Sequence, residues 1–95
     1  MATLHLVRQS AFNSNDFAQC LQTVANGDVI TLLDDGCYNL KHPLMSAIAS
    51  SIQVKIIEQH AKARGFDVDE QHFEKITMHK LVELTFTHDR VITWQ

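Results

Sequence analysis

The stretch Asp28–Gly36, which reads DVITLLDDG, constrains the fold of this chain most strongly. Its apolar part, Val29–Leu33, contains a single Thr, is too short for a helix and is rich in residues that favour strands. Such a run is typical of a strand buried on both faces, as in a parallel sheet covered by helices. We therefore expect Val29–Leu33 to be the central strand of an α/β domain.

The residues that follow this strand are the first place to look for a functional site. The sequence DDG at positions 34–36 predicts a tight turn, because Gly accepts a positive φ and Asp caps its own backbone. In open α/β sheets, ligands gather at the carboxyl ends of central strands. The loop Asp34–Leu40, which contains Cys37 and Tyr38, is therefore the first candidate region.

Short apolar runs alternate with amphipathic segments along the rest of the chain. The spacing of Phe17, Cys20, Leu21 and Val24 predicts one face of a helix. The segment Met78–Thr87 fits either a strand or a helix.

Alternating strands and short helices indicate βαβ units, and hence one α/β domain over residues 1–95 with a mostly parallel sheet of four or five strands. Further strands are expected at Leu4–Val7, Ile52–Ile57, Phe73–Ile76 and Val91–Trp94, and short helices after Pro43 and over Gln59–Arg64.

Length and composition narrow the class of protein. A chain of 95 residues that is 45% hydrophobic and 20% charged is expected to be one globular domain. Its small core suggests that another subunit completes the burial of apolar surface. A net charge of −3 disfavours direct binding of nucleic acid. No apolar run is long enough to span a membrane and the first residues do not resemble a signal peptide, so we expect a cytoplasmic chain.

The two cysteines, Cys20 and Cys37, are the candidate sulfur-carrying thiols. Cys20 lies in the apolar stripe of the first predicted helix, where it either packs as a small hydrophobic residue or carries sulfur. Cys37 lies in the loop after the central strand, where exposure is expected. No Lys, Arg or His lies within three residues of Cys37 to favour its thiolate, so a spectator role is the simpler interpretation.

The remaining polar residues form no recognisable catalytic or metal-binding motif. Turn formation explains Asp34 and Asp35 better than a metal or acid–base site, since adjacent side chains on an extended chain point apart. The six histidines are scattered without zinc-site spacing, and no phosphate-binding glycine motif occurs, so no metal and no cofactor are expected. Trp94 is either a cover for the core or an interface residue, and we take it as an interface candidate.

Several features together resemble one family. They are LHLV at residues 4–7, Ser10 and Phe12 before the first helix, LLDDG at residues 32–36, ARG at 63–65, LVELT at 81–85 and the terminal Trp94. Their order and spacing are similar to the DsrH/TusB family, the smallest subunits of the DsrEFH and TusBCD sulfur-relay complexes. The resemblance covers nearly the whole chain.

This resemblance implies a Rossmann-like domain with helices on both faces of the sheet and a helix over Lys80–Thr87. It also implies a heterohexamer with two kinds of companion subunit, TusC- and TusD-like or DsrE- and DsrF-like. In the TusBCD branch a persulfide sulfur is passed on for 2-thiolation of the wobble uridine of certain tRNAs. In the DsrEFH branch the related proteins serve dissimilatory sulfur oxidation.

The chain departs from its relatives in its cysteines. The sibling subunit that carries the relayed sulfur has a cysteine just after its third strand, where this chain has Ile57 and Glu58. Cys20 matches a cysteine of DsrH-type members, whereas Cys37 has no counterpart. We therefore expect a structural, non-catalytic subunit of a relay for tRNA thiolation. The alternatives are a subunit for sulfur oxidation and a sulfurtransferase that uses Cys20 or Cys37.

Overall fold

The computed structural model contains one five-stranded sheet and describes residues 2–66 and 73–94. The strand order is β4-β3-β2-β1-β5, and every neighbouring pair is parallel. All four residues of β2 are buried, and β2 is the central strand, as its uninterrupted apolar run predicted. The strands are β1 (Thr3–Val7), β2 (Val29–Leu32), β3 (Gln53–Ile57), β4 (Glu74–Ile76) and β5 (Arg90–Trp94).

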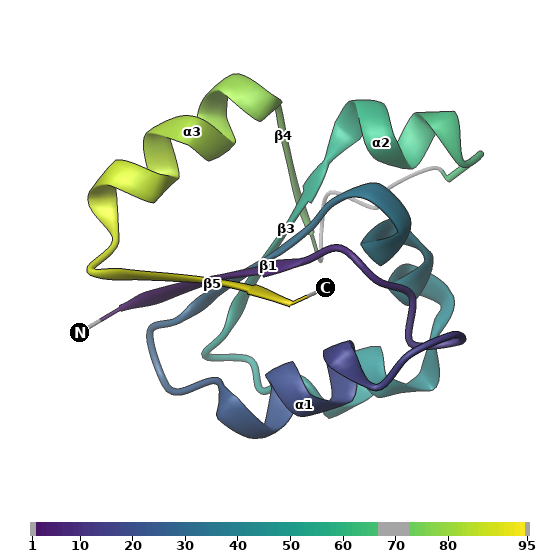
Figure 1. Cartoon of the computed structure of the whole chain (residues 1–95), viewed down its shortest axis with the longest axis horizontal. Helices are drawn as coiled ribbons and strands as arrows, with labels where there is room; N and C mark the ends of the chain where they lie inside the picture. The colour runs from purple at the N-terminus through teal and green to yellow at the C-terminus, as the bar shows by residue number, and fades with distance from the viewer. Residues whose placement is uncertain (1, 67–72, 95) are drawn as a thin grey trace.

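Among the described residues, three α-helices and two 3₁₀-helices connect the strands (Figure 1). The ambiguous segment at residues 78–87 is a helix, as the family resemblance implied. Its start is fixed by Thr77, whose hydroxyl oxygen accepts a hydrogen bond from the backbone N–H of Lys80 at 3.1 Å. The helices are α1 (Asp16–Thr23), η1 (Asp34–Lys41), η2 (Pro43–Ala47), α2 (Glu58–Ala63) and α3 (Met78–Thr87).

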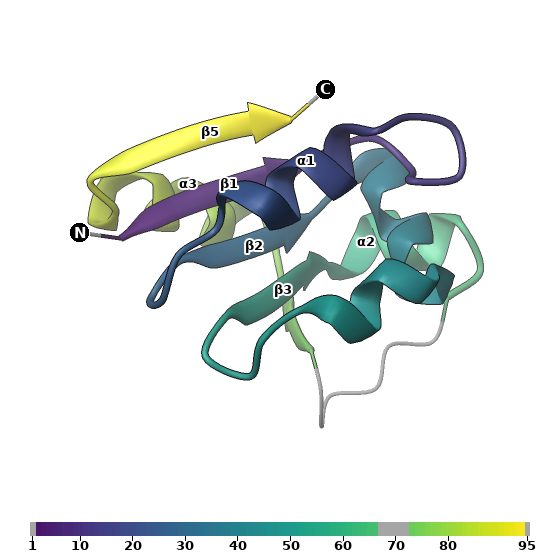
Figure 2. The same cartoon turned by 90° about the horizontal axis from the view of Figure 1, so that it is seen from below.

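The strand order places the connecting segments on two faces of the sheet. β2, β3 and β4 are each added beside the preceding strand, in the same direction across the sheet. After β4 the chain returns to the other side of the sheet, where β5 pairs with β1. Right-handed crossovers therefore put α1 and α3 on opposite faces, as Figures 1 and 2 show. An apolar cluster on the α1 face contains Phe17 and Cys20, and a second cluster on the other face contains Leu81 of α3.

The segment after β2 differs from the predicted loop. Residues 34–41 form the 3₁₀-helix η1, and the residue with positive φ is Asp34 rather than Gly36. A side chain at Gly36 is excluded for another reason, because a Cβ atom there would lie 2.0 Å from the backbone oxygen of Val7. Gly36 is thus required by the close approach of η1 to the end of β1, which no local pattern reveals.

Thr31, in the middle of β2, is buried without a partner for its hydroxyl group. Among the residues that the structure describes, the Oγ1 atom of Thr31 is the one buried side-chain polar atom without a hydrogen bond. In the sheet it lies between Leu6 of β1 and Lys55 of β3. The Lys55 ammonium group pairs with Glu74 instead of Thr31. Removing a hydroxyl group from water costs free energy, and without a hydrogen-bond partner in the protein nothing offsets that cost.

We predict that Thr31→Val stabilises the protein by about 1 kcal/mol, because Val keeps the shape of Thr and removes the unpaired hydroxyl. Thr31→Ser, which keeps the hydroxyl and removes the methyl group, is expected to destabilise by about 1 kcal/mol. Urea unfolding followed by circular dichroism measures both. A lower unfolding free energy for Thr31→Val would show that the hydroxyl has a stabilising partner.

Within residues 2–66 and 73–94, no helix combines the length and the apolar character needed to cross a membrane.

Candidate functional site at the carboxyl edge of the sheet

The carboxyl ends of β1, β2 and β3 bring together a cluster of charged side chains. Arg8 directly follows β1, Asp34 and Asp35 begin η1 after β2, and His60 and Arg64 lie on or just after α2, which follows β3. In a parallel sheet these strand ends lie at the same edge, which explains why residues far apart in sequence meet there. We call these five residues the edge cluster.

The Asp34 side chain and backbone link two neighbouring segments. Its carboxylate accepts a hydrogen bond from Nε of Arg8 at 2.9 Å, and its backbone N–H donates to Nδ1 of His60 at 2.9 Å. Because Nδ1 of His60 accepts a hydrogen bond, it carries no proton in this arrangement, and the neutral ring carries its proton on Nε2. The imidazole is thus oriented by the backbone and is not positioned as a base for either cysteine.

Arg64 forms the second half of the edge cluster. Its Nη2 and Nε atoms donate to the same carboxylate oxygen of Asp35 at 3.0 and 3.2 Å, and its Nη1 donates to the backbone oxygen of His60. The guanidinium group also lies 6.0 Å from the centre of the Tyr38 ring, which contacts Phe66 edge to face. These contacts fasten α2 onto η1.

The edge cluster pairs its charges internally. Arg8 with Asp34 and Arg64 with Asp35 are opposite charges in direct contact, and both carboxylates are more than a third exposed. Partly exposed pairs of this kind contribute little to stability, so their main effect is to fix the position of η1 and α2. No cysteine is exposed in the cluster, and its chemistry is that of a closed ionic surface rather than of a nucleophile.

Cys37 lies beneath this surface and is completely buried, which corrects the expected exposure. Residues 34–41 form a 3₁₀-helix instead of an open loop, so the side chain turns inward, where its Sγ atom lies 3.9 Å from the backbone oxygen of Leu32. Burial raises the pKa of the Cys37 thiol to about 11; Arg64 favours the thiolate, while Asp34 and Asp35 oppose it.

Cys20 lies on the buried face of α1 and is also inaccessible to solvent. Burial, and next the negative charge of Asp28, raise the pKa of the Cys20 thiol to about 12. Cys20 and Cys37 belong to the same apolar cluster on the α1 face. The structure therefore places both candidate thiols inside the core, where their protonated forms are favoured.

A chain of polar contacts that sequence reasoning missed joins Asp28, His5 and Trp94. The Asp28 carboxylate accepts hydrogen bonds from the backbone N–H groups of Thr3 and Ala25 and from Nε2 of His5, each at 3.0 Å. Burial alone would raise the pKa of Asp28, but these hydrogen bonds outweigh it and hold the pKa below its usual value. The side chains that pair in this chain of contacts lie 23 or more residues apart in the sequence. No local sequence pattern could therefore have indicated these contacts.

Trp94 completes this chain from the edge strand β5. Its Nε1–H donates to Nδ1 of His5 at 3.1 Å, and the two rings stack with their centres 6.3 Å apart. Because the indole group only donates, His5 must accept at Nδ1 and donate to Asp28 at Nε2. The half-buried Trp94 thus fastens β5 to β1, and its role as an interface residue stays a prediction.

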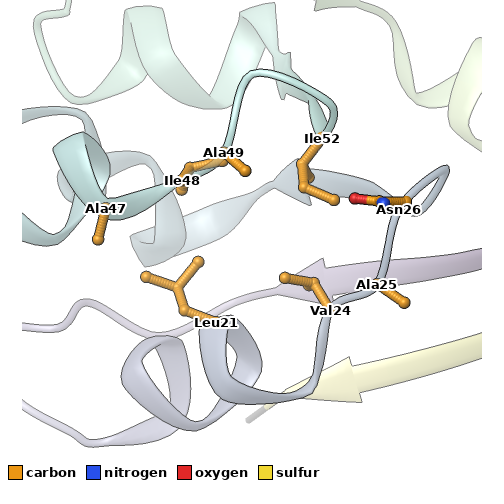
Figure 3. Close-up of a pocket in the computed structure, with 8 residues that line it drawn as sticks. All are labelled: Leu21, Val24, Ala25, Asn26, Ala47, Ile48, Ala49 and Ile52. Atoms are coloured by element: carbon orange, nitrogen blue, oxygen red, sulfur yellow. The ribbon is translucent and has the colours of Figure 1, made fainter.

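A shallow apolar groove opens on the α1 face beside the end of α1 (Figure 3). It has a volume of about 330 Å³ and offers mainly aliphatic side chains, with the amide of Asn26 at one end. Within the described ranges, no three His, Cys, Asp or Glu side chains are arranged to hold a metal ion. The residues lining the groove are Leu21, Val24, Ala25, Asn26, Ala47, Ile48, Ala49 and Ile52.

The buried thiols predict a loss of stability at alkaline pH. The pKa values of Cys20 and Cys37 are raised above the ordinary 9.0, so the folded state keeps protons that the unfolded chain releases. Stability is then complete below pH ~9 and falls as pH rises toward 11, by about 1 kcal/mol per thiol at pH ~10. Urea unfolding from pH 7 to 10 should show a shallower decline for Cys37→Ala than for the parent chain.

The same burial predicts that neither thiol of the folded protein reacts with an aromatic disulfide reagent at pH ~8, whereas both react in urea. A rapid stoichiometric reaction of one thiol in the folded state would contradict the placement of that cysteine.

Fold and site together define a small Rossmann-like α/β domain whose two thiols are enclosed in its core. The chain belongs to the DsrH-like family, since the family model described as "DsrH like protein" matches residues 9–91. Members of this family are subunits of sulfur-relay systems. The resemblance found in the sequence is thereby confirmed.

The fold is also similar to a solved structure. The solution structure of protein Tm0979 from Thermotoga maritima superposes with a TM-score of 0.62 over 92% of this chain and 93% of that chain, at 18% identity. At this identity the likeness concerns the fold alone. No curated protein matches the sequence.

Proposed function

We propose that this chain is a non-catalytic subunit of a cytoplasmic sulfur-relay complex that serves 2-thiolation of the tRNA wobble uridine. The family match supports the sulfur-relay part of this proposal, and the burial of both cysteines carries its non-catalytic part. A sulfur-relay step requires a thiolate that attacks the outer sulfur of an incoming persulfide and becomes the new persulfide, releasing the donor thiolate. That attack needs access to solvent and a thiol that ionises near neutral pH.

Cys20 and Cys37 meet neither requirement. Both side chains have no exposed surface, and their pKa values lie near 12 and 11. At neutral pH only about one thiol in ten thousand or fewer would be ionised at such pKa values. The sulfurtransferase alternative is therefore disfavoured by the same geometry, and the sulfur acceptor is expected on a companion subunit.

The edge of the sheet supports this assignment. By resemblance, the sulfur-carrying sibling has its cysteine directly after the third strand, where β3 of this chain ends in the buried Ile57 and Glu58 begins α2. The nearby His60 accepts a hydrogen bond from the backbone instead of a thiol. A relay subunit that lacks an acceptor contributes by holding its companions, TusC- and TusD-like chains, in a heterohexamer.

We predict that Cys20→Ala destabilises the chain by only about 1–2 kcal/mol and Cys20→Ser by as much or more, since a buried hydroxyl needs a partner. Cys37→Ala, Cys20→Ala and the double variant should all restore 2-thiouridine in tRNA when expressed in a strain that lacks the native gene. The measurement is mass spectrometry of nucleosides from purified tRNA, with copurification of the companion subunits as the control for assembly.

Two results would overturn parts of this proposal. If Cys20→Ser folds and assembles but abolishes 2-thiouridine, Cys20 takes part in the relay. If deletion of the gene leaves 2-thiouridine unchanged and stops oxidation of reduced sulfur, the chain serves the sulfur-oxidation branch.

A further inference from the structure

The turn at residues 25–28, which joins α1 to β2, presents an Asn–Gly pair to solvent. Asn26 and Gly27 are both exposed, and the φ of Gly27 is 88°, a value that favours glycine. The turn is closed by the backbone N–H of Asp28, which donates to the backbone oxygen of Ala25 at 3.0 Å. Asparagine is a chemically labile residue, and a following glycine gives its side chain an unhindered nucleophile.

We propose that Asn26 is a site of spontaneous deamidation, at which the folded chain converts with time into isoaspartate and aspartate forms. The nucleophile is the backbone nitrogen of Gly27, and its target is the side-chain carbonyl carbon of Asn26. This modification is independent of the sulfur-relay function proposed above, because it involves neither thiol.

The reaction needs water as its only co-reactant. A bond forms between the Gly27 nitrogen and the Asn26 carbonyl carbon, which closes a five-membered succinimide ring. The bond from that carbon to the amide nitrogen breaks, and ammonia leaves with the proton that the Gly27 nitrogen gives up. Water then adds to one of the two ring carbonyl groups and breaks its bond to the ring nitrogen. One choice gives aspartate, and the other gives isoaspartate, in which the backbone runs through the former side chain.

The structure leaves the nucleophile accessible. Within residues 2–66 and 73–94, the backbone N–H of Gly27 has no hydrogen-bond partner that must first be released. The space beside Gly27 is open, because a Cβ atom built there would meet no atom within 4 Å. Neither a side chain nor a neighbouring segment therefore obstructs closure of the ring or the later approach of water.

Ser51 activates the target. Its hydroxyl group donates to Oδ1 of Asn26 at 2.9 Å. Negative charge develops on this oxygen while the Gly27 nitrogen adds to the carbonyl carbon, and a donor aimed at such an oxygen stabilises the transition state. In the part of the chain that the structure describes, the amide nitrogen of Asn26 has no partner, so the leaving group is not held.

The other asparagines of the chain serve as internal controls. Asn13 and Asn15 are exposed, but each is followed by a residue with a side chain, which hinders attack by the backbone nitrogen. Asn39 is fully buried, and both ends of its amide group are hydrogen-bonded to backbone groups.

Conversion at this turn acts on the buried polar contacts behind it. The backbone N–H of Ala25 donates to the Asp28 carboxylate at 3.0 Å, and the same carboxylate holds His5, which in turn holds Trp94. Isoaspartate adds one methylene group to the backbone of the turn and so shifts Asp28 relative to Ala25. We therefore expect the isoaspartate form to hold His5 and Trp94 less firmly.

Incubation of the full chain in mildly alkaline buffer tests the site. Peptide mass spectrometry follows conversion of each amide to an acid, and a protein isoaspartate methyltransferase with labelled S-adenosylmethionine counts isoaspartate. Conversion at Asn26 should be about tenfold or more faster than at Asn13, Asn15 or Asn39, and Gly27→Ala should slow it by about tenfold or more. Because Ala is strained at this φ, Ser51→Ala is a second variant, which should slow conversion about threefold through loss of the donor. Circular dichroism verifies that both variants are folded.

Asn26→Asp is the matched control for the consequence. It carries the same added charge as the isoaspartate form but not the added methylene group. The isoaspartate fraction, separated by ion exchange, should therefore unfold at a lower urea concentration than Asn26→Asp. Fluorescence reports the loss directly, since Trp94 is the one tryptophan of the chain.

Four outcomes would overturn parts of the proposal. If Asn26 stays intact in the folded chain and converts only in urea, the fold protects the turn and the site is wrong. Equal conversion at Asn26 and Asn13 shows that the turn confers no reactivity. Faster conversion in Ser51→Ala shows that Ser51 restrains Asn26 instead of activating it. Equal urea midpoints for the isoaspartate fraction and Asn26→Asp show that the turn does not hold Asp28.

Discussion

The close approach of η1 to the end of β1 is the constraint on which the carboxyl edge of this domain depends. Gly36 lies so near the backbone oxygen of Val7 that no side chain fits between them. The backbone N–H of Leu33 donates to the same oxygen at 3.1 Å, and the chain then turns at Asp34, whose φ is 51°. This turn sends Cys37 into the core and leaves Asp34 and Asp35 at the surface, opposite Arg8 and Arg64.

In open α/β sheets the carboxyl edge is where ligands usually bind. In this domain that edge is covered by the ion pairs Arg8–Asp34 and Arg64–Asp35. Burial favours the protonated form of both thiols, and His60 is engaged by a backbone N–H. Within the described part of the chain, both thiols are therefore poor nucleophiles near neutral pH. The family to which it belongs takes part in sulfur-relay systems with companion subunits, which is the setting of the non-catalytic role proposed above.

A second set of polar contacts runs along the sheet from its amino edge to its carboxyl edge. The buried chain from Asp28 through His5 to Trp94 connects the start of β2, the middle of β1 and the end of β5. Each group satisfies the next, so the buried carboxylate and imidazole and the half-buried indole N–H all have hydrogen-bond partners. Trp94 thereby anchors an edge strand that has only one neighbour in the sheet. The position of β5 is thus set by its pairing with β1, by this polar chain and by the packing of Trp94 on the apolar cluster.

The sequence by itself determined the local elements and their order. The apolar run of Val29–Leu33 identified the central strand, and the spacing from Phe17 to Val24 identified α1. Both were recognisable because a buried strand or helix face leaves an apolar pattern within a single segment of sequence. Only the tertiary structure decided what depends on distant segments. It buried Cys37, which local sequence had placed in an open loop, and it joined His5, Asp28 and Trp94. These outcomes arise from contacts between residues far apart in the chain, for which a local pattern carries no signal.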